Sequence, residues 1–123
     1  MTKRVLDVGN CAADHGALRR LIEGAFDAEV VASHSRPEAL AALREESFDL
    51  VLVNRRLDRD SSEGLEVIRA MKADPDLAGT PVMLLTNYPE HQQAAIEAGA
   101  RPGFGKAELH EPTTLERLRE ALQ

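Results

Sequence analysis

Aromatic residues are scarce in this chain of 123 residues, at 3% of the sequence, and tryptophan is absent. Proteins that bind single-stranded nucleic acid stack the bases on aromatic side chains, so this scarcity argues against such a platform. Positive charge is also in deficit, because 15 basic residues face 21 acidic ones and give a net charge of −6. With its basic residues scattered, the chain is expected to bind neither nucleic acid nor an anionic membrane.

The sequence also contains few cysteines and no long apolar run. The single cysteine, Cys11, excludes an internal disulfide and is typical of a reducing compartment. No apolar run approaches the roughly 18 residues of a membrane span, and the first residues lack the apolar core of a secretion signal. These features predict a cytoplasmic protein. The spacing of the four histidines is not that of a metal site, and we expect no metal and no other cofactor. These histidines are His15, His34, His91 and His110.

A run of four branched apolar residues, 50–53, is the most informative stretch that is present. It follows Phe48-Asp49 and is closed by Asn54, which is the pattern of a strand buried on both faces of a parallel sheet. In open α/β sheets, ligand chemistry gathers just beyond the carboxyl ends of such strands. Asn54 therefore occupies the position where chemistry is expected, and its side chain is an amide rather than a carboxylate.

Strand-like and helix-like segments alternate five times along the chain. This alternation predicts a three-layer α/β fold, with a parallel sheet, helices on both faces and right-handed crossovers. Capping boxes at Ser35–Glu38 and Thr113–Glu116 are expected to begin the second and fifth helices. We expect residues 1–123 to form one domain. The predicted strands are 5–8, 29–32, 50–53, 81–86 and 103–106.

Seven segments in a fixed order carry a family resemblance that covers the whole chain. They are Arg4–Leu6, Asp14–Leu21, Phe48–Val53, Gly64–Ile68, Pro81–Thr86, Ala98–Ala100 and Lys106. Each is weak alone, but the ordered set resembles the receiver domain of bacterial response regulators. The resemblance implies a doubly wound, flavodoxin-like (βα)5 fold with strand order 2-1-3-4-5. It also implies a phosphoacceptor site at the carboxyl edge of the sheet.

The resemblance further implies particular residues at that site, and three of them are replaced here. Receivers end their third strand with an aspartate that accepts a phosphoryl group from a histidine kinase, and their first strand with two acids that hold Mg²⁺. Asn54 stands in place of the acceptor, and Gly9 and Asn10 in place of the two acids, whereas the phosphate-contacting Thr86 and Lys106 are kept. An amide cannot form an acyl phosphate. Mg²⁺ also loses its anionic oxygens, so we expect a degenerate pocket with no obligatory metal.

Three other acids and the retained lysine leave alternatives open. Asp58 and Asp60 follow the third strand and form either a relocated phosphoacceptor or metal site, or solvated loop acids. Because a buried unpaired ammonium is costly, Lys106 is expected to pair with Asp58 or Asp60 or to turn towards solvent. Asp7 is either a displaced pocket acid with a raised pKa or a structural acid paired with a neighbouring base.

The function expected from these features is that of a phosphorylation-independent pseudo-receiver, a signalling module that binds a protein and catalyses no reaction. The resemblance implies a partner face formed by the fourth helix, fifth strand and fifth helix. Its partner would be a signalling kinase, a regulator, an adaptor target or a second copy of the chain. Phe104 is alternatively a core residue. The residues expected on this face are His91, Gln92, Ala95, Gly103, Phe104 and Arg117.

Two other functions remain open from the sequence. One is a small-molecule sensor in which a neutral pocket of Asn10, Asn54 and Thr86 takes an uncharged polar ligand. The other is a regulator phosphorylated at a displaced loop acid, Asp58 or Asp60. Because the sequence ends just after the fifth helix, we expect either a stand-alone adaptor or a domain cut from a longer protein.

Overall fold

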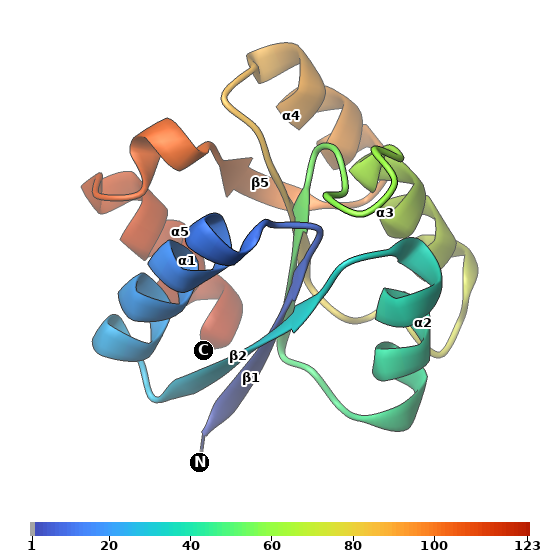
Figure 1. Cartoon of the computed structure of the whole chain (residues 1–123), viewed down its shortest axis with the longest axis horizontal. Coiled ribbons are helices and arrows are strands. Elements are labelled where there is room, and N and C mark those ends of the chain that lie inside the picture. The colour runs from blue at the N-terminus through green and yellow to red at the C-terminus, as the bar shows by residue number, and fades with distance from the viewer. Residues whose placement is uncertain (1) are drawn as a thin grey trace.

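The computed structural model describes residues 2–123 and has helices on both faces of a central sheet. Five parallel strands run in the order β2-β1-β3-β4-β5, which confirms the predicted topology. Figure 1 shows α1 and α5 on one face of the sheet and α2, α3 and α4 on the other. The strands are β1 (Lys3–Val8), β2 (Ala28–Ser33), β3 (Leu50–Asn54), β4 (Val82–Leu85) and β5 (Arg101–Phe104). The helices are α1 (Ala12–Ala25), α2 (Arg36–Glu45), α3 (Gly64–Ala73), α4 (Pro89–Glu97) and α5 (Pro112–Leu122).

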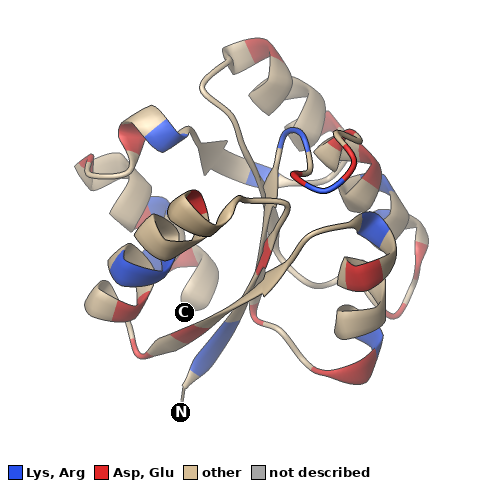
Figure 2. Cartoon of the chain, viewed as in Figure 1, with Lys and Arg blue, Asp and Glu red and all other residues tan. Residues whose placement is uncertain are grey.

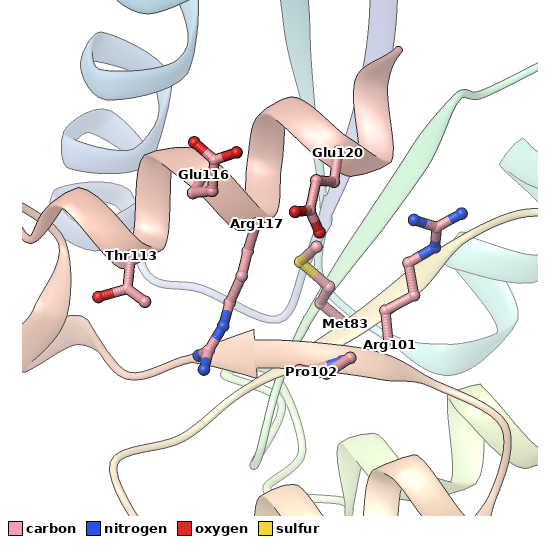
Figure 3. A pocket seen from close by; sticks show the side chains of 7 residues that line it. All are labelled: Met83, Arg101, Pro102, Thr113, Glu116, Arg117 and Glu120. Atoms are coloured by element: carbon pink, nitrogen blue, oxygen red, sulfur yellow. The ribbon is translucent and has the colours of Figure 1, made fainter.

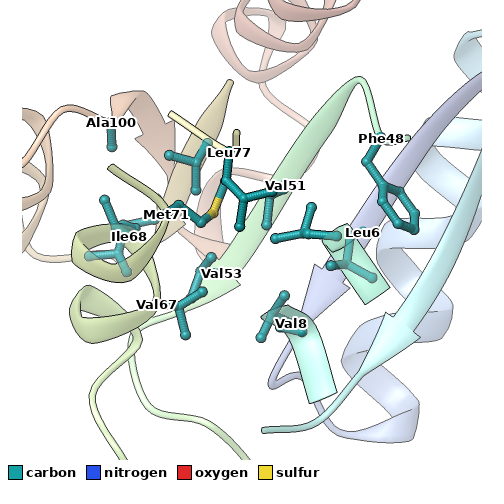
Figure 4. Packing of buried hydrophobic residues seen from close by; sticks show 14 of the residues in the cluster. Leu6, Val8, Phe48, Val51, Val53, Val67, Ile68, Met71, Leu77 and Ala100 are labelled. Carbon is teal, nitrogen blue, oxygen red and sulfur yellow. The ribbon is translucent and has the colours of Figure 1, made fainter. Parts of the chain in front are cut away.

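Two hydrophobic clusters fill the two faces of the sheet. In β3, Val51 and Val53 belong to the cluster that packs against α2, α3 and α4, whereas Leu50 and Leu52 belong to the one beneath α1 and α5. Figure 4 shows the first cluster. Strands buried on both faces lose the alternation of polar and apolar residues, which is why the sequence reads as an unbroken apolar run. None of the helices within residues 2–123 is long and apolar enough to span a membrane.

The register of the strands brings the loops after β1 and β3 together. Val8 is paired with Val53 on one side and with Ser33 on the other, and Asn54 is paired with Leu85. The carboxyl ends of these strands therefore form one edge of the sheet. The Asp58 N–H also donates to the Gly9 carbonyl at 3.0 Å, so the two loops are hydrogen-bonded to each other.

Helix α2 begins as predicted, at Ser35. The Ser35 side-chain oxygen accepts a hydrogen bond from the Glu38 N–H at 3.3 Å. The Glu38 carboxylate reaches one residue further back than in an ideal capping box and accepts from the His34 N–H at 3.0 Å. Both bonds satisfy N–H groups that have no partner within the helix.

Helix α5 does not begin at the predicted box, Thr113–Glu116. Glu111 is the N-cap and Pro112 occupies the first turn, where its fixed φ is compatible with a helix and its missing N–H costs nothing. The Thr114 hydroxyl is buried inside the helix and donates to the Glu108 carbonyl at 2.6 Å. The proline therefore sets the start of α5 ahead of the threonines.

Strand β5 lies two residues earlier in the chain than the predicted segment 103–106. The strand ends at Phe104, and the following residues, Lys106–Glu108, form a short 3₁₀ turn. The Gly105 N–H donates to the Glu108 side chain at 2.9 Å, which closes this turn. Lys106 therefore lies in the turn after β5 rather than in the strand.

Candidate functional site

Asn54 ends β3 with its side-chain amide bound to the backbone of two loops. Its Nδ2 donates to the carbonyl of Arg56 at 2.7 Å and to the carbonyl of Gly9 at 3.3 Å. Arg56 lies in the loop after β3 and Gly9 in the loop after β1, so the amide connects the two loops. An ionised carboxylate has no proton to donate and cannot make either bond. The amide at this position therefore has a structural use that an aspartate would not serve.

Gly9 has no room for a side chain. Its φ of +82° is disfavoured for other residues, and a Cβ atom there would lie 2.9 Å from Leu57 Cα and closer still to the Leu57 side chain. The Gly9 N–H donates to the Ser33 carbonyl at 2.8 Å. A side chain at this position, whether of an acid or of any other residue, would therefore collide with Leu57.

Asn10 belongs to a small polar cluster that is buried beneath the pocket. Its Nδ2 donates to Asp7 Oδ1 at 2.5 Å, and His15 Nδ1 lies 2.7 Å from the other oxygen of Asp7. Asp7 and Asn10 are each 1% exposed. Asn10 Oδ1 has no hydrogen-bond partner among residues 2–123. Asp7 is therefore a structural acid paired with a base, and His15 on α1 is that base.

The ionisation of Asp7 makes stability depend on pH. Burial raises the pKa of the Asp7 carboxyl above its ordinary value of 3.8, while the bonds from Asn10 and His15 act in the opposite direction. A carboxyl with a raised folded-state pKa favours folding in its neutral form. Its contribution is complete below the unfolded-state pKa and is lost as the pH rises through the folded-state pKa.

The variant Asp7→Asn should not lose stability as the pH rises, because an amide stays neutral. Its side chain can still accept a hydrogen bond from Asn10 and donate one to His15. We expect its free energy of unfolding, relative to that of the unchanged protein, to increase from pH 4 to pH 8. Urea denaturation at a series of pH values measures this difference. A difference that stays constant over this range would contradict the raised pKa.

Lys106 pairs with neither Asp58 nor Asp60, and its partly exposed side chain is bound to another acid rather than turned freely to solvent, so neither of the two expected arrangements is the observed one. Its Nζ lies 2.7 Å from Asp14 Oδ2, an ion pair that also lowers the pKa of Asp14. The two side chains are 32% and 41% exposed, so the pair stabilises the fold by only about 0–1 kcal/mol. Asp14 was missed as a site residue, although it lies in the family-like segment 14–21. The signal was its place in the first turn of α1, at the same edge of the sheet.

Asp58 and Asp60 each have partners outside the pocket. His34 Nδ1 lies 3.0 Å from Asp58 Oδ2, and Asp60 Oδ1 accepts from the Ser62 N–H at 3.0 Å. The hydrogen bonds from Ser62 lower the pKa of Asp60. No group of three or more His, Cys, Asp or Glu residues is placed to hold a metal ion within the described chain, 2–123. The two loop acids therefore have local roles on the α2 side of the loop.

The residues at the three acid positions do not fit a magnesium ion. Mg²⁺ requires anionic oxygens in near-octahedral geometry. Gly9 offers no side chain, and the amides of Asn10 and Asn54 direct N–H protons at neighbouring oxygens. Asp7 is the nearby carboxylate, but both of its oxygens are already bound. No phosphoryl-transfer step that depends on magnesium can be assigned to this set of residues.

A shallow pocket of about 220 Å³ lies over the ends of β3 and β4. Asn54 and Thr86 line it, as expected, but Asn10 does not, because its side chain is turned towards Asp7. Figure 2 shows both signs of charge along the loop between β3 and α3. Of the charged residues in that loop, only Arg55 and Arg56 line the pocket, and together with Lys106 they make it cationic rather than neutral. All the lining residues are Asn54, Arg55, Arg56, Leu85, Thr86, Asn87, Tyr88 and Lys106.

The expected partner face contains less exposed apolar surface than the sequence suggests. Ala95 is fully buried and Phe104 is 1% exposed, packed in the cluster beneath α1 and α5. Neither residue therefore presents apolar area on this face, and of the two roles that the sequence left open for Phe104 the structure shows the one in the core. The most exposed large apolar residues in this part of the chain are Tyr88 and Ile96, neither of which was predicted to lie on the partner face. The partly exposed members of the predicted face are His91, Gln92 and Arg117.

Gln92 and Arg117 hold the backbone of β5 in place. The Gln92 amide donates to the Leu84 carbonyl at 2.8 Å and accepts from the Gly103 N–H at 2.9 Å. It thus bridges β4 and β5 where their register is interrupted. The Arg117 guanidinium donates to the Gly103 carbonyl. Gly103 itself cannot carry a side chain, because a Cβ atom would overlap the Leu84 carbonyl oxygen.

A groove of about 370 Å³ lies between β5 and α5 on the same face. Figure 3 shows side chains of both signs around it, with Arg101 from β5 and Arg117, Glu116 and Glu120 from α5. The floor includes the thioether of Met83. This arrangement is a polar groove with a small apolar base, and it extends the surface formed by α4 and β5.

Comparison with known proteins agrees with the fold. No curated protein matches the chain. A protein from Chloroflexus aurantiacus J-10-fl has a similar structure, with a TM-score of 0.87, 22% identity and coverage of 99% of this chain and 98% of that one. A response regulator from Thermotoga maritima has a TM-score of 0.80 and 25% identity, with coverage of 99% of this chain and 98% of that one. The chemotaxis response regulator CheY4 of Vibrio cholerae has a TM-score of 0.77 and 23% identity, with coverage of 99% of this chain and 100% of that one. The model of the response regulator receiver domain matches residues 11–123, and the chain therefore belongs to that family.

Proposed function

We propose that residues 1–123 form a single pseudo-receiver domain, that is, a member of the receiver family that does not accept a phosphoryl group. It transmits a signal by binding a protein partner, without phosphorylation at the end of β3 and without catalytic turnover. The observation that carries the proposal is the amide of Asn54, which donates to the carbonyls of Gly9 and Arg56. A phosphoacceptor must be a free carboxylate that can attack phosphorus, and this side chain is a neutral donor held by its neighbours.

Further support comes from the residues that surround the amide. The positions of the two metal-binding acids hold Gly9, which has no space for a side chain, and Asn10, which is bound to Asp7. Lys106, which would contact the phosphate in a receiver, is paired with Asp14. The first two changes remove the nucleophile and the metal that phosphoryl transfer requires, and the third leaves the charge of the lysine shared with Asp14.

Phosphorylation at a displaced acid is the less favoured alternative. Asp58 is bound by His34 and Asp60 by Ser62, and within residues 2–123 neither acid belongs to a group of three or more His, Cys, Asp or Glu residues that could hold a metal ion. An acceptor at these positions would have to give up its partner and act without metal-assisted charge neutralisation.

The surface of α4, β5 and α5 is the proposed partner-binding face. Tyr88 and Ile96 supply its exposed apolar area, and the groove between β5 and α5 supplies charges of both signs. Arg117 contributes to the groove while it holds the Gly103 carbonyl. A protein partner, including a second copy of this chain, would therefore meet a mixed apolar and charged surface.

Intact-mass measurement after incubation with acetyl phosphate and Mg²⁺ tests the proposal. We expect no added phosphoryl group on the unchanged protein. The variant Asn54→Asp is also expected to stay unmodified, because the acids that would bind the metal are still absent. In two-dimensional amide spectra recorded with beryllofluoride already present, the addition of Mg²⁺ should likewise cause no change in either protein, because the metal-dependent adduct cannot form.

A receiver with all three acids, treated in parallel, is the positive control for reagent quality. A phosphoryl group on an aspartate is labile in both acid and base, and its presence would contradict the proposal. Any stoichiometric phosphoryl group on an aspartate of the unchanged protein rejects it, and peptide mapping then decides between Asp58 and Asp60.

A further inference from the structure

We infer that the pocket over Asn54 and Thr86 binds a small oxyanion of the phosphate type, reversibly and without a metal ion. The inference rests on the proposed function, because a pocket that is never phosphorylated is available to a free ligand. It replaces the uncharged ligand suggested by the sequence with an anionic one. The charges that line the pocket carry the argument.

The lining of the pocket has reversed its charge relative to the pattern that the resemblance implies. A receiver site presents three carboxylates and one lysine, and it needs a cation before it can accept a phosphoryl group. This pocket is lined by Arg55, Arg56 and Lys106, and none of its lining residues, all within the described range, is an Asp or Glu. A recess with charge of one sign concentrates the field and attracts ligands of the opposite sign.

Arg55 is the residue best placed to anchor an anion. Lys106 is paired with Asp14, and Arg56 lies 3.4 Å from the Glu63 carboxylate. The Arg55 side chain, by contrast, makes no hydrogen bond or ion pair with any residue from 2 to 123. A planar guanidinium binds phosphate and carboxylate oxygens through two parallel N–H groups.

Neutral side chains at the pocket also have protons left to donate. The Thr86 hydroxyl oxygen accepts from the Tyr88 N–H at 3.2 Å, which leaves the hydroxyl proton for a ligand. Asn87 Oδ1 accepts from the Ala107 N–H at 3.2 Å, which leaves its amide N–H groups for the same use. The ammonium of Lys106 carries three protons, and one of them is directed at Asp14. Charged and neutral donors are therefore both available at the pocket.

The size of the pocket limits the ligand to a small group. Its volume of about 220 Å³ lies below the ~300–1,000 Å³ of ordinary small-molecule sites. A single tetrahedral group fits this description better than a nucleotide. The ligand is therefore inorganic phosphate or the phosphate of a small phosphorylated metabolite, and these two sources share the same chemistry.

A two-dimensional amide titration of the full chain tests the inference. Inorganic phosphate and, separately, glycerol phosphate are added in the presence of EDTA, at an ionic strength held constant with chloride. We expect saturable, reversible shifts at the amides of Arg55, Thr86, Asn87 and Lys106. If only the metabolite shifts these amides, the phosphate monoester is the ligand; if both do, inorganic phosphate is sufficient. No saturable shift with either probe overturns the inference.

Two arginine substitutions separate a specific site from a general effect of charge. Arg55→Gln is expected to weaken binding about tenfold or more, because a charge-assisted hydrogen bond contributes about 1.5–3 kcal/mol. Arg20→Gln removes the same charge from an exposed position on α1 and is expected to leave the affinity unchanged. Equal affinities of Arg55→Gln and the unchanged protein, or equal losses in both variants, contradict the inference. Intact mass measured on separate samples treated with acetyl phosphate and Mg²⁺ reports covalent phosphorylation, which would instead reject the proposed function.

Discussion

Gly9→Ala is expected to lower the free energy of unfolding by about 2–5 kcal/mol, the sum of an overpacked contact and a left-handed backbone. The added methyl group would lie 2.9 Å from Leu57 Cα, and the φ of +82° would persist because backbone bonds fix the loop. Urea denaturation followed by circular dichroism measures the change. Gly9→Asp, which would return an acid to this position, should be at least as destabilising.

Gly24→Ala is the matched control for this substitution. Gly24 lies in α1, and a Cβ atom there has no neighbour within 4 Å. Alanine is the better helix former, so this variant is expected to be more stable by about 0.5–1 kcal/mol. The same chemical change should therefore have opposite signs at the two glycines. A neutral Gly9→Ala would mean that the contact between the two loops is looser than the structure indicates.

His15→Ala is expected to lower the free energy of unfolding by about 2–3 kcal/mol at pH 7, the range for a hydrogen bond to a charged group. The imidazole lies 2.7 Å from the buried Asp7 carboxylate, and an ionised acceptor requires the facing nitrogen to carry a proton. Without His15, the carboxylate keeps only the bond from Asn10. The loss should become smaller as the pH falls and Asp7 becomes protonated.

A double-mutant cycle separates this pair from the general effect of truncating a helix residue. His15→Ala is made in the Asp7→Asn background, where no buried charge remains, and its cost there should be smaller. His110→Ala removes an exposed imidazole and is expected to change stability by less than about 0.5 kcal/mol. Equal costs of His15→Ala in both backgrounds would show that the ring stabilises α1 by packing rather than through Asp7.

The topology was predictable from the sequence because it follows from local patterns. Unbroken apolar runs such as 50–53 and 82–85 indicate doubly buried strands, and alternation with helices allows few arrangements of a parallel sheet. The replacement of the acceptor by Asn54 was also visible. The bonds that its amide makes to Gly9 and Arg56 were not, because they depend on how two loops meet in space.

The partners of charged residues were the least predictable part of the site. Lys106 and Asp14 are 92 positions apart, and no periodicity connects a helix start with a turn after the last strand. The expected partners, Asp58 and Asp60, were nearer in the inferred site but are held by their own loop and by His34. Side-chain pairing across a sheet edge depends on directions that a one-dimensional pattern does not contain.

The contact between Gly9 and Leu57 also couples substitutions at this edge of the sheet. An acid at position 9 would meet Leu57, and an aspartate at position 54 would lose the bonds to two carbonyls, so neither change alone is compatible with the present arrangement of the loops. Positions 9, 54 and 57 would therefore have to change together before an acidic site could be accommodated at this edge.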